Sequence, residues 1–401
     1  MSIFVNAYST IRQEVPFHGS GSSGEAIALR TLADLDADKP FPVRPDADPH
    51  LISEAAELKN HLNGFYNYAV EQGVERAGEY TTVTHAVGQH LRHVCCNYAF
   101  ERPDGFGPED LREFAPWAAQ TNSIFFFPDG TVRNADGVDL LDPALADRTP
   151  PVLPPVTAES FNRMQRIRGE LWNSGIRISP LLPPVRSEKE ILLRTPEEMF
   201  TRATTLAVVG TVAGFVLEDR PVDFVELRGG SRFAFDSFTE TEQEFIARIE
   251  SVQDAAGAPR YTEADNQAAF QLHWGFIAAE LLAWAVGLVE IDTAQLYPAD
   301  LSVLRGALRA AGRQDNVADA LRLRDLSEIC DLFERTFSLR WYAVEQDVSG
   351  APSADGANGT VGANQAVHIE PVESSILLER HRAFAWMTVQ DVPFDQVDLS
   401  T

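Results

Sequence analysis

Four consecutive charged residues near the C-terminal end are the part of the sequence best suited to chemistry. The segment Glu379–Arg382 reads Glu-Arg-His-Arg and stands between two apolar runs of a predicted helix. A carboxylate beside a histidine can carry out general acid–base catalysis. Charged groups in apolar surroundings must be paired or reach water. The favoured interpretation is therefore an ion network that ties this helix to Asp331 or Glu334, because structural networks also concentrate charge.

Another acidic residue, Glu280, interrupts an apolar predicted helix and is the expected partner of Arg380. The best candidate cluster for catalysis therefore consists of Glu280, Asp331, Glu379, Arg380 and His381. A hydrolase-type enzyme would need these side chains to converge in a concave pocket. If they are buried in mutual pairs instead, they do not support catalysis.

Histidines and cysteines are concentrated between positions 85 and 96, and both are zinc ligands. The candidate ligands are His90, His93 and Cys95. Adjacent cysteines on a strand point to opposite sides, so Cys95 and Cys96 cannot ligate together. The spacing favours a helix–strand junction with buried thiols that behave as small apolar groups. We therefore predict no metal.

Gly19, Gly21 and Gly24 have the spacing of a dinucleotide-binding turn. That turn requires a strand that feeds directly into the first glycine, so that the pyrophosphate meets a helix N-terminus. Residues 11–18 intervene here, and the spacers between the later glycines are serines. The sequence therefore predicts a flexible loop and no cofactor.

The chain is strongly acidic. Its 401 residues include 33 Lys+Arg and 59 Asp+Glu, which gives a formal charge of −26. Duplex binding requires basic residues that neutralise phosphates, and anionic membranes attract basic segments. This charge argues against nucleic acids and membranes as partners. It favours a basic protein partner, whose charge would complement an acidic surface.

Cysteine use and apolar patterning indicate the compartment. The three cysteines are an odd number with one adjacent pair, which is no disulfide framework and suits a reducing cytoplasm. No basic stretch followed by a long apolar run opens the chain, so we expect no secretory signal. The longest apolar stretches, Thr204–Leu217 and Phe276–Val289, are shorter than the roughly 20 residues that cross a bilayer.

The elements that must position these residues divide the chain. Residues 1–142 mix strand and helix periods and predict a small α+β domain. Its strands are expected at Ile3–Ser9, Val94–Phe100, Ser123–Phe127, 131–133 and 134–137, and its helices at Leu51–Gln72 and 107–120. Residues 143–185 are rich in proline and predict a linker with one helix. Residues 186–401 predict an all-helical domain, so the fold class is α+β with a mainly α-helical C-terminal domain.

Helix-capping residues mark the starts of the predicted C-terminal helices. Thr195 is a capping residue followed by Pro196 at the first helical position and by Glu198 at the third. Two further helices are expected to start after Thr239 and after Thr262. One long helix is expected over Asn266–Glu290, and it is apolar on nearly every face, as a central buried helix is. Further helices are expected over 325–341 and 372–389.

Four segments of the helical half resemble a known bacterial family, the domain of unknown function 4272. They are Arg194–Glu198 with Arg202 and Ala203, Trp274 with Trp284 and 285–288, Cys330 through Trp341, and Glu379–Trp386. The resemblance covers about residues 186–390 and implies a helical fold without a known activity. The departures from the family pattern are Gly275, Ile277, Ser338 and Ala385. If polar residues at these positions form a site in relatives, this chain lacks part of it.

No motif in the sequence assembles a catalytic site. The leading functional prediction is therefore a non-enzymatic binding or regulatory protein with an acidic interaction surface. The alternative is a hydrolase-type enzyme that uses the Glu/His/Asp cluster of the helical domain.

Overall fold

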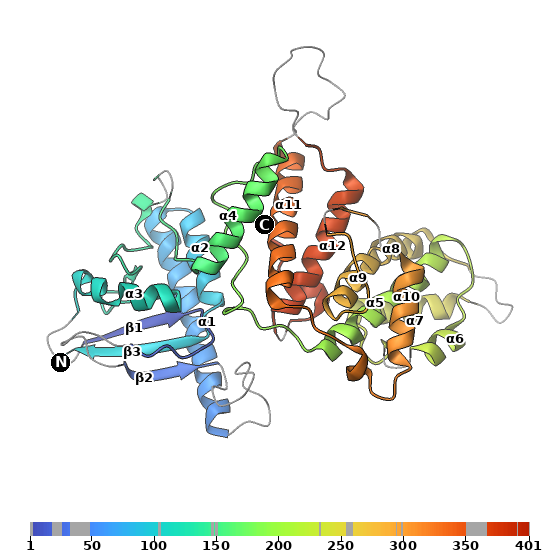
Figure 1. Cartoon of the computed structure of the whole chain (residues 1–401), viewed down its shortest axis with the longest axis horizontal. Coiled ribbons are helices and arrows are strands. Elements are labelled where there is room, and N and C mark those ends of the chain that lie inside the picture. The colour runs from blue at the N-terminus through green and yellow to red at the C-terminus, as the bar shows by residue number, and fades with distance from the viewer. Residues whose placement is uncertain are drawn as a thin grey trace, which may run out of the picture. The chain divides into compact units, whose positions relative to one another are not determined.

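The computed structural model has two compact units (Figure 1). It describes residues 3–17, 26–32, 49–102, 106–145, 148, 151–231, 234–253, 260–293, 295–297, 300–349, 367–390 and 392–400. The first unit comprises Met1–Asn162 and Arg186–Ile191, and the second comprises Arg163–Val185 and Leu192–Thr401. The predicted fold class is confirmed, because a small antiparallel sheet with a few helices is followed by a mostly helical region.

Five antiparallel strands form the sheet of the first unit. They are β1 (Ile3–Ser9), β2 (Ala26–Thr31), β3 (Cys96–Arg102), β4 (Ser123–Phe126) and β5 (Val132–Arg133). Their order across the sheet is β2-β3-β1-β4-β5, so the first strand of the chain is the central one. Ala7 pairs with Tyr98 of β3 on one side and with Phe125 of β4 on the other. The strand predicted at Ile3–Ser9 is confirmed.

Helices cover both faces of this sheet. The helices α1 (Pro49–Ala77) and α2 (Thr82–Arg92) pack on one face, and α3 (Leu111–Thr121) packs on the other after the 3₁₀ turn η1 (Pro108–Asp110). Successive strand residues point to opposite faces. Tyr8 accordingly stacks near Phe65 of α1, whereas Ala7 belongs to the cluster of Phe114 in α3. The two faces of β1 thus contribute side chains to two separate apolar layers.

Two predictions for the first unit have different outcomes. The strand predicted at 134–137 is wrong, since these residues form a turn in which Asn134 Oδ1 accepts a hydrogen bond from the backbone N–H of Val138 at 3.0 Å. The side chain of an asparagine can replace a ladder partner in this way. The glycine-rich segment Gly19–Gly24 lies outside the described residues.

A buried polar cluster holds Arg186–Ile191 in the first unit. Glu190 Oε1 accepts hydrogen bonds from Thr10 Oγ1 at 2.6 Å and from Asn122 Nδ2 at 3.2 Å. Its Oε2 accepts from both the backbone N–H and the hydroxyl of Ser187, each at 2.8 Å. A buried carboxylate with this many donors is satisfied, so the segment is a structural part of the sheet unit.

The region predicted as a linker, 143–185, is divided between the two units, with the boundary between Asn162 and Arg163. It contains the short 3₁₀ helix η2 (Pro143–Leu145) and the helix α4 (Ala158–Asn173). From Arg163 onward it belongs to the helical unit, where Ile167 and Leu171 pack with Leu339 of α11 (Leu326–Ser349). The apolar stripe of α4 therefore makes it part of a core, whereas the proline content of the segment suggested an extended tether.

Helices make up the second unit. Besides α4 and α11 they are α5 (Pro196–Leu217), α6 (Phe224–Gly230), α7 (Glu240–Val252), α8 (Glu263–His273), α9 (Gly275–Ala285), α10 (Leu301–Gly312), α12 (Pro371–Thr388) and the short η4 (Val317–Ala320) and η6 (Phe394–Gln396). Figure 1 shows α11 and α12 side by side, and α5 packs on both α8 and α9. A Cβ at Gly210 of α5 would lie 2.8 Å from the Phe276 ring, so the absence of a side chain permits this close approach.

The single helix predicted over Asn266–Glu290 is wrong. It is broken at Trp274, which ends α8 and precedes α9. The backbone N–H of Ile277 bonds to Trp274 O, a tighter turn than an α-helix allows. Both α8 and α9 contact α5 on either side of this break. By contrast, the capping boxes at Thr195, Thr239 and Thr262 are all present.

Among the described helices, only α5 is long and apolar enough to cross a membrane, with 22 residues and a mean hydropathy of 1.5. The expectation that this apolar stretch is too short is therefore wrong, because the helix begins at Pro196 and not at Thr204. In this structure 78% of the most apolar 18-residue segment of α5 is buried inside the protein. A core helix of a globular protein has this property.

Candidate functional site

Three consecutive residues of α12 contact three different neighbours. Glu379 is 5% exposed and its Oε1 lies 3.4 Å from Arg382 Nη1 on the same helix. Among the described residues its Oε2 has no hydrogen-bond partner. Burial raises the pKa of the Glu379 carboxyl, and Arg382 opposes this rise. Glu379 is thus a buried carboxylate with one weak ion pair.

Arg380 is 3% exposed and turns toward α9. Its Nη1 donates to the backbone carbonyl of Gln295 at 3.4 Å. Glu280 attracts it electrostatically, in agreement with the expected partnership. Burial lowers the pKa of Arg380 and raises the pKa of Glu280, while each group shifts the pKa of the other in the opposite direction. This attraction links α12 to α9.

His381 is 3% exposed and packs against aromatic residues of α11. Its ring lies 5.5 Å from the ring of Phe337 and 6.0 Å from that of Phe333, measured between centroids. Burial, with a smaller contribution from Arg340, lowers the pKa of His381 to about 4. In the described part of the chain, Nδ1 has no hydrogen-bond partner. The imidazole is therefore neutral at physiological pH and enclosed by apolar rings.

Asp331 and Glu334 of α11 bond to α4, which corrects the prediction that they tie α12 to α11. Asp331 Oδ1 lies 2.6 Å from Arg166 Nη2 and 3.4 Å from Arg163 Nε. Glu334 is fully buried, and its Oε1 accepts from Arg168 Nε at 2.9 Å. Burial raises the pKa of Glu334, and Arg168 opposes the rise. The sequence could not reveal this, because α4 had been assigned to a linker.

The structure does not bring the five candidate side chains together on one surface. Glu379, Arg380 and His381 are successive residues of a helix, and successive positions point about 100° apart because a turn contains 3.6 residues. They face Arg382, α9 and α11 respectively. Asp331 faces α4. None of these residues lines either of the two hollows described below.

The metal candidates are likewise held by the protein. His93 Nδ1 lies 2.6 Å from the Gln89 carbonyl oxygen, and burial lowers the pKa of His90 to about 4. The Cys95 thiol donates to the carbonyl of Ile11 at 3.0 Å, and burial raises its pKa, which disfavours the thiolate that binds metal. Within the described residues, no three His, Cys, Asp or Glu side chains could hold a metal ion together.

An open hollow of about 590 Å³ lies elsewhere in the second unit. We call it the tail hollow, because the residues after α12 form one wall. It is lined by Arg194, Arg202, Trp386, 237–241 at the start of α7, and 392–396 in the tail. Arg194, Arg202 and Trp386 are also residues that carry the family resemblance, so two segments far apart in the sequence meet here.

Both arginines of the tail hollow bond to the protein itself. Arg194 donates from Nε to Trp386 O at 2.9 Å and from Nη2 to Val392 O at 2.8 Å. Its guanidinium lies over the Trp386 ring, 4.3 Å from the centroid. Arg202 forms a buried ion pair with Glu242 and lies 4.6 Å above the Phe394 ring. These cations hold the tail against α5 and α7.

The accessible charges of the tail hollow are acidic. Glu240 and Asp395 are exposed and line it, while the two arginines are occupied by internal partners. Thr241 Oγ1 donates to Asp395 Oδ2 at 3.4 Å, which directs that carboxylate. Sequence reasoning missed Asp395 and Glu240. The available signal was the Pro-Phe-Asp run at 393–395, a turn with one aromatic and one acidic residue after the last helix.

Comparison with known proteins gives one family. The family model described as "Domain of unknown function (DUF4272)" matches residues 163–397, which is more than half of the chain. No match was found among curated proteins or among solved structures. The matched range starts where the second unit starts, at Arg163 in α4.

Proposed function

Since the chain belongs to the domain of unknown function 4272 family, whose description assigns no activity, we propose from geometry that it is a non-enzymatic binding protein. Its tail hollow receives a basic side chain of a partner protein. One observation carries this proposal. The hollow has room for a long side chain, its own cations are occupied internally, and the carboxylates Glu240 and Asp395 remain exposed in its lining.

The chemistry of the lining suits an arginine or lysine. A guanidinium donates paired hydrogen bonds to carboxylates in a planar fork. The wall of the hollow also contains the partly exposed Phe238, and aromatic groups attract cations. The net charge of −26 adds long-range attraction for a basic partner and accelerates its association at low salt.

The hydrolase alternative has less support. It needs Glu280, Asp331, Glu379 and His381 to converge on a concave surface. Three of the predicted cluster residues are at most 5% exposed, and each faces a different neighbour. Neither the tail hollow nor the hollow beside α10 is lined by any of them.

A cytoplasmic location is part of the same proposal. None of the three cysteines forms a disulfide and all are buried, although Cys95 and Cys96 are adjacent. Proteins of oxidising compartments commonly use their cysteines in disulfides. Buried reduced thiols therefore support a reducing environment.

Titration calorimetry with a hexa-arginine peptide at low ionic strength tests the proposal. The double variant Glu240→Gln/Asp395→Asn removes both acidic groups of the hollow and is expected to weaken binding about tenfold or more, because charge-assisted hydrogen bonds are lost. Glu244→Gln is the matched control, since Glu244 is exposed on the same helix and lies outside the hollow.

Added salt should weaken the wild-type interaction, because exposed charges are screened. The proposal fails if the wild-type chain does not bind the peptide at low salt. It also fails if Glu244→Gln weakens binding as much as the double variant, since the attraction would then be a general property of the acidic surface.

A further inference from the structure

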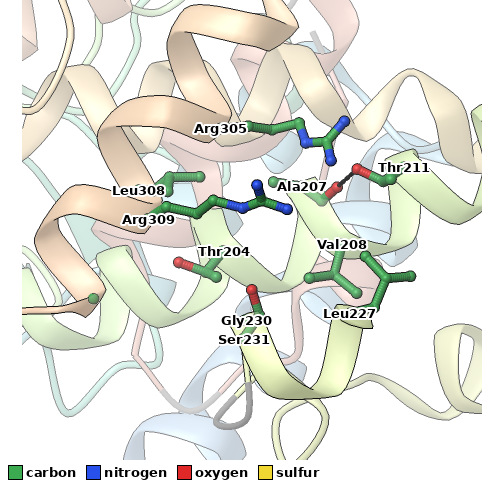
Figure 2. Close-up of a pocket in the computed structure, with 11 residues that line it drawn as sticks. Thr204, Ala207, Val208, Thr211, Leu227, Gly230, Ser231, Arg305, Leu308 and Arg309 are labelled. Carbon is green, nitrogen blue, oxygen red and sulfur yellow. Dashed lines mark hydrogen bonds between the residues drawn. The ribbon is translucent and has the colours of Figure 1, made fainter. Parts of the chain in front are cut away.

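A second hollow in the helical unit has the opposite chemistry. It lies where α5, α6 and α10 meet, and we call it the α10 pocket (Figure 2). Its polar lining consists of Thr204 and Thr211 from α5, Ser231 after α6, and Arg305 and Arg309 from α10. Figure 2 shows both guanidinium groups extending over the α5 surface that carries the threonines.

The two arginines of this pocket have no acidic partner in the described part of the chain. No ion pair of 4.0 Å or less joins either of them to a carboxylate there, although Glu226 attracts Arg305 over a longer distance. Residues 301–314 contain three arginines and no acidic residue. The charged residues of α10 are therefore all basic, although the chain as a whole has a formal charge of −26.

This arrangement is unfavourable without a ligand. Arg305 and Arg309 stand four positions apart on one helix, and like charges at this spacing repel each other. Arg305 is also half-buried. Burial lowers the pKa of its guanidinium, and Arg309 lowers it further. A shared anion would relieve both the repulsion and the loss of hydration.

The threonine hydroxyls of the α10 pocket already donate hydrogen bonds within α5. Thr204 Oγ1 donates to Phe200 O at 2.9 Å, and Thr211 Oγ1 donates to Ala207 O at 2.7 Å. Their hydroxyl protons are therefore used within α5, and the guanidinium groups supply the charged N–H donors of the pocket. The pocket volume of about 30 Å³ gives room for a group of a few atoms only.

We infer that the α10 pocket binds a single phosphate group through Arg305 and Arg309. A guanidinium offers two parallel N–H donors that match the oxygens of a phosphate. Two such forks on one side of a phosphate provide donors for several of its oxygens. This inference is independent of the proposed function of the tail hollow, since the two hollows share no lining residue.

The phosphate could be free inorganic phosphate or the end of a phosphate monoester whose remainder lies outside the narrow pocket. Calorimetry on the full-length chain distinguishes these sources with three probes: sodium phosphate, ribose 5-phosphate, and ribose. Sodium chloride at matched ionic strength accounts for general salt effects. Tighter binding of ribose 5-phosphate than of phosphate, with no binding of ribose, identifies a monoester as the better ligand. Equal binding of both identifies the phosphate group alone.

Single substitutions connect the binding to the pocket. Arg305→Met and Arg309→Met should each weaken phosphate binding about tenfold or more, because a charge-assisted hydrogen bond is lost. Arg313→Met is the matched control, since Arg313 is an exposed arginine that follows α10 and does not line the pocket. Arg309 is exposed as well, so its replacement leaves the fold intact, and circular dichroism of the ligand-free variant checks this.

Two results would overturn the inference. One is a wild-type chain that binds neither sodium phosphate nor ribose 5-phosphate at millimolar concentrations. The other is equal loss of binding in Arg313→Met and Arg309→Met, which would assign the effect to the total charge of α10. Failure of hexa-arginine binding at the tail hollow would leave this inference unaffected, because it concerns different residues.

Discussion

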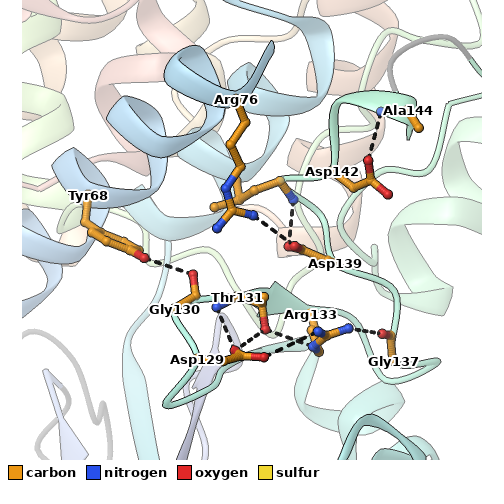
Figure 3. Close-up of polar contacts among 11 residues, drawn as sticks. Tyr68, Arg76, Asp129, Gly130, Thr131, Arg133, Gly137, Asp139, Asp142 and Ala144 are labelled. Atoms are coloured by element: carbon orange, nitrogen blue, oxygen red, sulfur yellow. Dashed lines mark hydrogen bonds and ion pairs between the residues drawn. The ribbon is translucent and has the colours of Figure 1, made fainter.

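Two groups of arginines in this protein have opposite surroundings. In the first unit, Arg133 of β5 donates from Nε to Thr131 Oγ1 at 2.8 Å and from Nη1 to Gly137 O at 2.7 Å (Figure 3). Asp129 Oδ2 lies 3.6 Å from its Nη2. In the α10 pocket, Arg305 and Arg309 form no such bonds within the described residues.

The internal partners of an arginine indicate whether it can bind a ligand, and the net charge of the chain does not. Arg133 has a carboxylate, a hydroxyl and a carbonyl as acceptors, so a ligand would compete with its internal partners. The α10 pocket leaves its N–H donors available. The same distinction applies to the tail hollow, where Arg194 and Arg202 are occupied and the carboxylates are available.

The largest effect is expected for a fully buried partner. Replacing Arg168 by Met leaves the Glu334 carboxylate without its cation in the protein interior, and loss of one member of a buried pair costs roughly 3–5 kcal/mol. Urea unfolding followed by circular dichroism measures the change. The double variant Arg168→Met/Glu334→Gln should recover part of the loss, because the buried charge is gone. No recovery would mean that Arg168 acts mainly through packing.

The next largest effect is expected for His381, a buried base. Like the arginines of the α10 pocket, it has a nitrogen without a hydrogen-bond partner among the described residues. The pKa of His381 is about 4 in the folded chain against an ordinary value of 6.5. Between these values the unfolded chain binds a proton that the folded chain excludes. The stability from neutral His381 is therefore complete above pH 6.5 and is lost as the pH falls toward 4, by roughly 3 kcal/mol in total.

The substitution His381→Gln removes this titration. Its unfolding free energy should depend less steeply on pH between 6.5 and 4 than that of the wild type, whatever its stability at neutral pH. Parallel pH curves for the wild type and His381→Gln would contradict the burial of this imidazole.

A smaller loss is expected in the turn region. Arg133→Ala removes two hydrogen bonds and one ion pair of a partly buried side chain, and each such bond contributes about 1 kcal/mol. Thermal unfolding should show a lower midpoint, and amide exchange at Gly137 and Val138 should become faster. Arg112→Ala provides the control, because Arg112 is exposed on α3 in the same unit. Equal midpoints for both variants would show that the turn network does not stabilise the fold.

The smallest effect on stability is expected in the α10 pocket. Arg309→Met removes an exposed side chain and relieves repulsion with Arg305, so stability without phosphate should change by less than about 0.5 kcal/mol. Urea unfolding at low ionic strength measures this. A destabilisation as large as that of Arg133→Ala would show that Arg309 has a structural partner, and the contrast between the two regions would be lost.

Local features of this fold could be predicted from the sequence. Helices start after Thr195, Thr239 and Thr262 as predicted, and the capping residue expected at Thr195 forms a capping box with Glu198. The strand at Ile3–Ser9 follows from its own pattern. The expected attraction between Glu280 and Arg380 is also present, because few other charges are available inside an apolar helix pair.

Features that depend on distant segments could not be predicted. The partners of Asp331 and Glu334 are on α4, about 160 residues away in the chain, and nothing near them indicates this. The α10 pocket was missed because no helix was predicted at Leu301–Gly312. Two arginines four positions apart, without an acidic residue within one turn of either, were the available signal. The tail hollow depends on residues 392–396, which carry no helical or strand periodicity.

The path of the chain has a consequence for anyone who shortens it. A fragment that begins at Arg163, where the family match begins, would carry Arg186–Ile191 without Thr10 and Asn122, and Glu190 would face solvent or misplaced neighbours. A fragment that stops at Asn162 would lack Glu190, and the donors of Thr10 and Asn122 would then be buried without their acceptor. The backbone leaves the sheet unit after Asn162 and returns to it at Arg186, so cutting the chain at one point does not yield two complete units. Separating the units therefore requires a circularly permuted gene or co-expressed segments.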